Sequence, residues 1–348
     1  MKLKLLVYAI AIVLLFAGLS LVLDFYPEEE KALRQQIRQA VEDTFPEDAA
    51  AVAKSFGLFA YAAQEDKSGA LVSTAPSVVL IHGLDDPGAV WQNLAPILAD
   101  QGMNVWQMYY PNDQAISDSA SLFASELQRL SLSGVNQISI VAHSMGGLVS
   151  REMLTSPGID YRKRMQLGQL PVIRHLIMVG TPNHGSELAR YRFFSEFRDQ
   201  WVNIVENGGS PFRGFMDGAG EAKIDLLPES AFLQALNARA HPQGVKMLTI
   251  AGLVSAWNEQ KMSRFLTENF EPETATEIGA FVLSMNNGLG DGLVTVDSSR
   301  LEGVEQRTVN GTHLTMIRNL SENDQRIAPA IPIIVEVLNH DSDEELAQ

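Results

Sequence analysis

The sequence predicts an α/β fold, in which a mostly parallel, doubly wound sheet carries an inserted cap and follows one N-terminal transmembrane helix. From residue 77 onward, short runs rich in valine and isoleucine alternate with longer segments of helical periodicity. Continuous apolar strands that alternate with helices are typical of a parallel sheet covered on both faces. An irregular segment interrupts this alternation, and an uncharged apolar segment lies near the amino terminus.

The composition limits the possible functions. The 348 residues are 46% hydrophobic and 20% charged, so the chain can bury a large core. A formal net charge of -16 without a basic run disfavours nucleic acid as a partner, because phosphates need lysine and arginine. The chain contains no cysteine, which excludes disulfides, thiolate metal sites and a cysteine nucleophile.

The apolar segment near the amino terminus, residues 5–23, contains no charged side chain. As a helix it would span about 28 Å, close to the hydrocarbon thickness of a bilayer. The charges that flank it are Lys2 and Lys4 before it and Asp24, Glu28, Glu29 and Glu30 after it. The positive-inside rule then places the amino terminus in the cytoplasm and the remaining chain outside. We expect residues 1–24 to be an uncleaved anchor, and a cleaved signal peptide that releases a secreted protein is the alternative.

Three further regions are expected after the anchor: a helical linker at 25–70, the main domain at 71–340 and a disordered acidic tail at 341–348. Apolar residues recur every four positions along the linker, at Leu33, Ile37, Val41 and Phe45. This stripe predicts a helix that ends at Pro46 and either packs on the domain or lies near the membrane.

Within the main domain, strands are expected at 77–83, 104–111, 137–143, 173–180, 245–252 and 305–311, and helices at 89–102, 117–130, from 144 and at 327–338. Ser117 or Asp118 could cap the second of these helices. The aromatic-rich cap, at about 186–243, is either a mobile lid or an ordinary helical excursion packed on the sheet edge.

The segment 139–149, SIVAHSMGGLV, passes from a strand into a helix through small residues around Ser144. In a G-x-S-x-G turn the positions two before and two after the serine must be small, because the chain folds back on itself there. Ala142 and Gly146 occupy these positions. The segment therefore predicts a nucleophilic serine, and such a serine needs a histidine to accept its proton and an acid to hold that histidine.

The order of residues along the chain selects the partners of Ser144. On a sheet of this type the acid follows the serine, and the histidine comes last. His313 follows the final expected strand, whereas its rival His184 comes too early for this order. Asp291 lies in a glycine-flanked loop, and the alternative acid Asp297 could instead cap the segment that follows it.

A tetrahedral intermediate at Ser144 would need backbone donors that form an oxyanion hole. The first expected donor is the N–H of Met145, directly after the serine, and the second is the N–H of Leu84 in the loop HGLDDPG. We expect His82 in the same loop to orient the loop rather than to act as a general base.

With these residues in place, the chain resembles the bacterial lipases and esterases of the α/β-hydrolase fold. Five motifs carry the resemblance in the expected order: VVLIHGL, VAHSMGGLVSR, VGTPNHGSELA, DGLV and THLTMI. The resemblance implies a Ser144, Asp291 and His313 triad with Leu84 and Met145 as oxyanion donors. It also implies a carboxylic ester hydrolase that cleaves lipid or other acyl esters through an acyl-enzyme on Ser144.

Two departures from the family pattern concern Ala142, which replaces the usual glycine, and Thr315. Calcium-dependent members carry an aspartate at the position of Thr315, so we assign no metal, and the chemistry calls for no cofactor. An acyltransferase that uses the same triad remains an alternative function. A non-catalytic, membrane-anchored binding domain is the third interpretation, and it should lack a triad member.

Overall fold

The computed structural model describes residues 27–61, 75–84, 86, 88–186, 220–254, 288–321 and 326–346. The predicted anchor and most of the predicted cap, residues 187–219, lie outside the described residues. None of the helices in the described part of the chain combines the length and hydropathy that crossing a bilayer requires.

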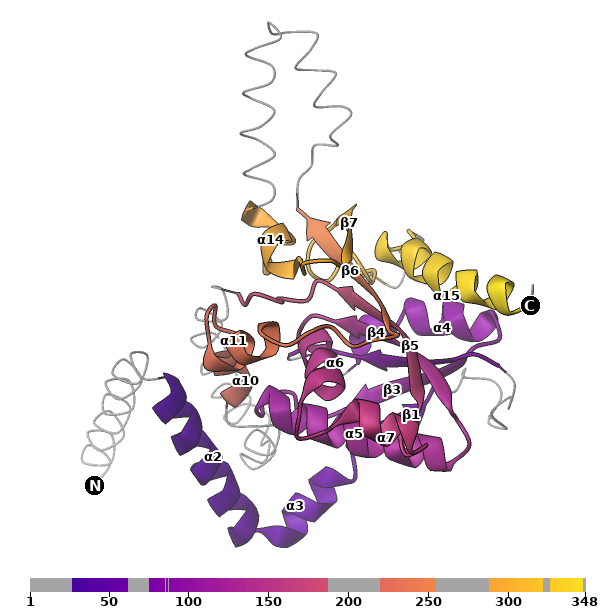
Figure 1. The fold of residues 1–348 in the computed structure, drawn as a ribbon. Coiled ribbons are helices and arrows are strands. Elements are labelled where there is room, and N and C mark those ends of the chain that lie inside the picture. Colours follow the sequence, from indigo (N-terminus) through magenta and orange to yellow (C-terminus); the bar gives the residue numbers. More distant parts are fainter. Residues whose placement is uncertain are drawn as a thin grey trace, which may run out of the picture.

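A seven-stranded sheet forms the centre of the domain, with the order β1-β3-β2-β4-β5-β6-β7 (Figure 1). Its strands are β1 (Gly57–Ala60), β2 (Ser77–Ile81), β3 (Asn104–Tyr109), β4 (Gln137–His143), β5 (Val172–Val179), β6 (Lys246–Leu253) and β7 (Glu305–Asn310). Strands β2 to β7 are parallel, and they are the six strands that the sequence predicted.

Strand β1 is the antiparallel edge of the sheet, and it lies within the segment expected to be a helical linker. Its Gly57 pairs with Tyr109 of β3, and the backbone N–H of Leu58 donates to Glu126 Oε2 at 3.2 Å. A strand of four residues with one buried position has too few residues to show a period of two. The sheet therefore begins earlier in the chain than the sequence analysis expected.

Helices cover both faces of the sheet (Figure 1). One face packs against α5 (Ile116–Leu132), α6 (Met145–Thr155), α7 (Tyr161–Gln166) and α11 (Ala231–Asn237), and the other against η1 (Ala89–Trp91), α4 (Leu94–Asp100) and α15 (Ala330–Leu346). In β2, Val79 and Ile81 enter the first core and Val78 and Leu80 the second. All four are buried, which explains why the strand is a continuous apolar run.

The carboxyl-terminal helix differs from its prediction in length. It begins at Ala330 and continues to Leu346, beyond the expected end at residue 338. Most of the segment that was expected to be a disordered tail is therefore helical. Charged side chains are compatible with helix, so a change from apolar to acidic composition alone does not end one.

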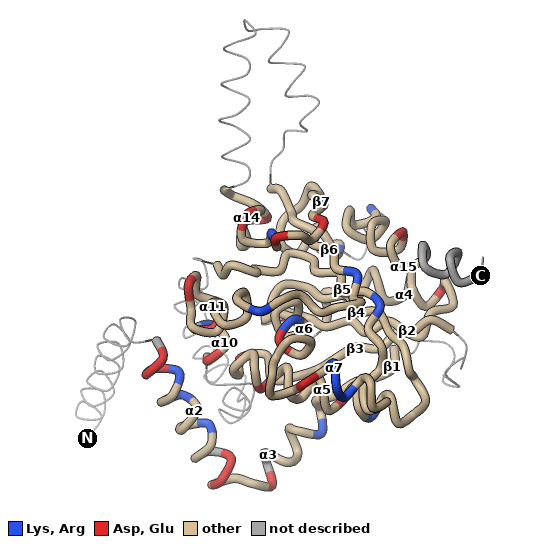
Figure 2. The backbone as a smooth tube through the Cα atoms, in the orientation of Figure 1, with Lys and Arg blue, Asp and Glu red and all other residues tan. Residues whose placement is uncertain are grey.

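Helix α2 (Pro27–Thr44) ends before Pro46, as predicted, and α3 (Pro46–Ala53) follows it directly. The helix lies against the domain, which is one of the two places expected for it, but Leu33 and Ile37 of its apolar stripe are 39% and 41% exposed. Basic and acidic residues both occur along the length of α2 (Figure 2). Lys31 pairs with Asp225, and Arg38 pairs with Glu221 at 3.3 Å and with Asp118 at 2.6 Å.

The acids that hold α2 also cap α5. Glu221 and Asp225 lie on α10 (Glu221–Asp225), where they accept hydrogen bonds from the backbone N–H groups of Ala115 at 2.9 Å and Ile116 at 3.0 Å. The expectation that Ser117 or Asp118 could cap this helix is therefore wrong. Burial raises the pKa of both Glu221 and Asp225, and the cations of α2 oppose this shift. Helices α2, α5 and α10 are thus joined by several ion pairs, in which Glu221 and Asp225 are the buried partners.

Candidate active site

The turn at Ser144 joins β4 to α6 and has an unusual backbone conformation. Ser144 has φ 54° and ψ -130°, a strained combination for a residue with a side chain. Its N–H donates to Val179 O at 2.8 Å, and Thr181 Oγ1 donates to Ser144 O at 2.9 Å. These bonds hold the serine in the sharp strand-to-helix turn that the motif predicted.

Small residues around Ser144 allow three chain segments to meet there. A Cβ atom on Gly146 would lie 2.4 Å from Ile81 O, and one on Gly83 would lie 2.6 Å from Ser144 Cβ. Both positions therefore require glycine. Ala142 is fully buried in the core between β2 and β5, so its methyl group fits where the family pattern has glycine.

Asp291 and His313 meet in a buried hydrogen bond. His313 Nδ1 lies 2.7 Å from Asp291 Oδ2, and the backbone N–H of His313 donates to Asp291 O at 2.9 Å. The other oxygen, Asp291 Oδ1, accepts from the N–H groups of Leu293 and Val294. Because a carboxylate only accepts, His313 carries its proton on Nδ1, and Nε2 is free to accept a proton.

The carboxyl edge of the sheet brings Ser144, Asp291 and His313 to one side. Ser144 follows β4, His313 follows β7, and Asp291 is held beside the end of β6. A Cβ atom on Gly180, after β5, would lie 3.1 Å from Asp291 Oδ2 and 3.2 Å from His313 Nδ1, and φ +60° also favours glycine there. Within the described residues no hydrogen bond joins Ser144 Oγ to His313. Such catalytic hydrogen bonds commonly shorten and form only when substrate binds.

The rival residues lie elsewhere. His184 is exposed, and its Nδ1 lies 3.5 Å from the side-chain amide of Asn237. Asp297 is exposed in the first turn of α14 (Val296–Ser299) and does not cap it. The cap is Thr295, whose Oγ1 accepts from the N–H of Ser298 at 3.0 Å. The cap role that was considered for Asp297 is therefore wrong.

The two expected oxyanion donors follow β4 and β2. Met145 is the first residue of α6, so its N–H has no acceptor within the helix. Leu84 lies two residues after His82 in the same loop. His82 Nδ1 donates to Gly83 O at 2.9 Å. Burial lowers the pKa of His82, which favours the neutral ring and suits the expected role of orienting the loop.

Two contacts in this loop escaped the sequence analysis. The hydroxyl of Tyr110 donates to His82 O at 2.6 Å, and the two rings stack at 4.7 Å. Asp86 Oδ1 accepts from the N–H groups of Gly88 and Val90. The tyrosines at the end of β3 were the available signal, since β3 neighbours β2 in the sheet.

In the part of the chain that the structure describes, no group of three histidine or acidic side chains could hold a metal ion. Thr315, at the position of the calcium-associated aspartate, exchanges hydrogen bonds with Thr312 instead.

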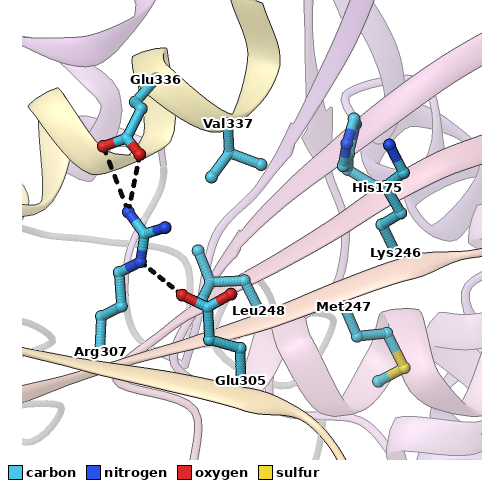
Figure 3. Close-up of a pocket in the computed structure, with 8 residues that line it drawn as sticks. All are labelled: His175, Lys246, Met247, Leu248, Glu305, Arg307, Glu336 and Val337. Carbon is cyan, nitrogen blue, oxygen red and sulfur yellow. Dashed lines mark hydrogen bonds and ion pairs between the residues drawn. The ribbon is translucent and has the colours of Figure 1, made fainter. Parts of the chain in front are cut away.

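A hollow at the opposite edge of the sheet is unrelated to this constellation (Figure 3). It lies beside the first residues of β6 and β7, Lys246 and Glu305. Its Arg307 is held by Glu305 at 2.7 Å and by Glu336 at 3.2 Å. Arg307 is thus already engaged by two carboxylates.

Comparisons with known proteins agree with this architecture. A family model described as the PGAP1-like alpha/beta domain matches residues 97–255. The chain is similar to the mature lipase BlEst2 of Bacillus licheniformis, with a TM-score of 0.50 and 19% identity over 81% of this chain and 97% of that one. It is also similar to the lipase of Staphylococcus hyicus, with a TM-score of 0.53 and 13% identity over 82% and 100% of the two chains. The chain has the α/β-hydrolase fold.

The predicted α/β-hydrolase fold with a mostly parallel sheet and the resemblance to bacterial lipases and esterases are confirmed. The N-terminal transmembrane helix stays a prediction. Lipase 1 of Pelosinus fermentans shares the fold as well, with a TM-score of 0.50 and 13% identity over 76% of this chain and 98% of that one. No curated protein matches the chain in sequence. The matched family segment contains Ser144 and ends before Asp291 and His313, so the assignment of the triad stays a prediction.

Gly146, two residues after the serine, provides a test of the turn. Gly146→Ala is expected to lower the free energy of unfolding by about 1–3 kcal/mol, because the new methyl group overlaps Ile81 O. Gly158→Ala is the matched control, since the nearest atom to its Cβ lies 3.9 Å away. Denaturant unfolding would measure both variants, and equal stabilities would contradict the described turn.

Proposed function

We propose that this α/β-hydrolase is a serine carboxylic ester hydrolase, a lipase or esterase that cleaves lipid or other acyl esters. The observation that carries the proposal is the buried 2.7 Å hydrogen bond between His313 Nδ1 and Asp291 Oδ2, at the sheet edge that also carries Ser144. The bacterial lipases that share the fold support the substrate class, although a fold alone does not fix a reaction.

In the proposed mechanism, Ser144 Oγ attacks the ester carbonyl while His313 Nε2 accepts the hydroxyl proton. Asp291 holds the ring and stabilises the imidazolium. The N–H groups of Met145 and Leu84 stabilise the negative oxygen of the tetrahedral intermediate. His313 then returns the proton to the departing alcohol, which leaves an acyl-enzyme on Ser144. Water, activated by the same histidine, releases the acid and restores the serine.

Covalent chemistry at Ser144 is the first expectation. A fluorophosphonate probe should label the wild type, and Ser144→Ala should abolish both labelling and the hydrolysis of p-nitrophenyl esters. Ser121→Ala, at an exposed serine on α5, should change neither. Unchanged turnover in Ser144→Ala would reject the mechanism, and esters of graded acyl length would define the substrate range of the active wild type.

The identity of the acid is the second expectation. Asp291→Asn should lower kcat by at least about 100-fold with little change in KM. The amide no longer stabilises the required tautomer of His313 or its imidazolium. The same exchange in a serine-protease triad lowers kcat about 10⁴-fold. Asp297→Asn should retain full kcat and change stability by less than about 0.5 kcal/mol, since its side chain is exposed. Steady-state kinetics and unfolding would decide, and exchanged phenotypes would make Asp297 the acid.

We also propose that residues 1–24 anchor the chain as a single span in a bacterial inner membrane, with the catalytic domain on the periplasmic side or outside. The support is the uncharged segment 5–23 between lysines and glutamates.

Alkaline phosphatase fused to the carboxyl terminus should therefore be active in a bacterial host, and the protein should stay in the membrane after a carbonate wash. A soluble product shortened by about 20 residues would instead show cleavage of a signal peptide.

A further inference from the structure

His143, the residue before Ser144, contacts the catalytic loop directly. It is the last residue of β4 and is 2% exposed. Its Nε2 lies 2.9 Å from the backbone carbonyl oxygen of His313, and the two rings lie 4.6 Å apart between centroids. Because a carbonyl oxygen only accepts, His143 must carry its proton on Nε2 and donate it.

The other ring nitrogen shows that this histidine is not placed there for packing alone. Within the described part of the chain, Nδ1 of His143 is buried and has no hydrogen-bond partner. An unpartnered buried nitrogen destabilises a fold, and an apolar side chain in contact with Trp91 would avoid that penalty. The hydrogen bond from Nε2 to His313 is therefore what distinguishes histidine here, because an apolar side chain could not donate it.

His313 is held from two directions. Its N–H and its ring Nδ1 both bond to Asp291, whereas its carbonyl oxygen bonds to the residue next to Ser144. The first two contacts fix the base relative to its acid. The contact with His143 fixes the base relative to the strand that ends at the serine. Displacing a reacting group by about 1 Å can lower the rate about 100-fold. Loss of the hydrogen bond from His143 would allow such a displacement of His313.

We propose that His143 is a positioning residue, which holds the backbone of His313 at a fixed distance from Ser144 through its Nε2–H; this inference rests on the proposed ester hydrolysis. Burial holds the pKa of His143 well below its ordinary value, and the rings of His313 and His82 and the charge of Arg318 act in the same direction, whereas the hydrogen bond to the carbonyl oxygen of His313 opposes the shift. The ring therefore stays neutral while His313 gains and loses a proton during turnover.

The test compares two amide variants in the full-length protein. In His143→Gln the amide nitrogen reaches the place of Nε2, and in His143→Asn it reaches only the place of Nδ1. We expect His143→Asn to lower kcat by about 10–100-fold with KM within about threefold, because the carbonyl oxygen of His313 loses its donor. His143→Gln should keep kcat within about fivefold of the wild type.

The rates are normalised to active sites titrated with a fluorophosphonate, so a loss of folded protein does not count as slower chemistry. Equal normalised kcat values for the two variants would overturn the role of His143. Ser144→Ala separates the two proposals: if it stays active, the proposed function fails, whereas an inactive Ser144→Ala with unimpaired His143→Asn rejects the positioning role alone.

A measurement on the wild type keeps the proposal testable even if neither variant folds. The histidines of the protein are labelled with ¹³C and ¹⁵N, and the ring of His143 is identified by its coupling across the hydrogen bond to the carbonyl carbon of His313. At neutral pH this ring should show a protonated Nε2 and a bare Nδ1. A ring at this position that is protonated on Nδ1, or charged at neutral pH, would contradict the inference.

Discussion

The backbone turn at Ser144 is the constraint on which the rest of the site depends. A serine with φ 54° can be held there only if its neighbours supply both space and bonds. Gly146 lets the helix start against the carbonyl of Ile81, and Thr181 and Val179 bind the two polar groups of the Ser144 backbone. The strain is thus balanced by contacts from β2 and from the end of β5, which makes the position of the serine a property of the whole sheet.

The parallel strands and the site residues that follow them could be predicted because both depend on local or ordered signals. Buried strands such as β2 are continuous apolar runs, and the serine, acid and histidine occur in the order that such a sheet imposes. The remaining features depend on contacts between distant segments. Strand β1 is recognisable only by its pairing with β3, and the cap of α5 comes from α10, about a hundred residues later. Thr295 could have been preferred to Asp297 as a cap, because it stands three residues before the N–H that it accepts.

The histidines of the chain show how far residue type alone can be interpreted. His313, His143 and His82 all lie within the same part of the structure, and each is buried. They differ in what their ring nitrogens contact: a carboxylate for His313, a backbone carbonyl of a neighbouring loop for His143, and the adjacent carbonyl for His82. A charged partner stabilises an imidazolium, whereas burial lowers the pKa of His143 and His82 and favours their neutral rings. The proposed division between a base, His313, and its supports rests on these surroundings and not on the sequence position.

The ionic contact of α2 also sets where the folding unit begins. Helix α2 adds no strand and little apolar surface to the core, yet Lys31 and Arg38 compensate two carboxylates that the domain buries. A chain trimmed to the first strand of the sheet would leave Glu221 and Asp225 inside the protein with their countercharges removed, a loss that costs several kcal/mol for a buried pair. The smallest autonomous unit therefore starts ahead of Lys31, and the helix that precedes the sheet is an integral part of the domain.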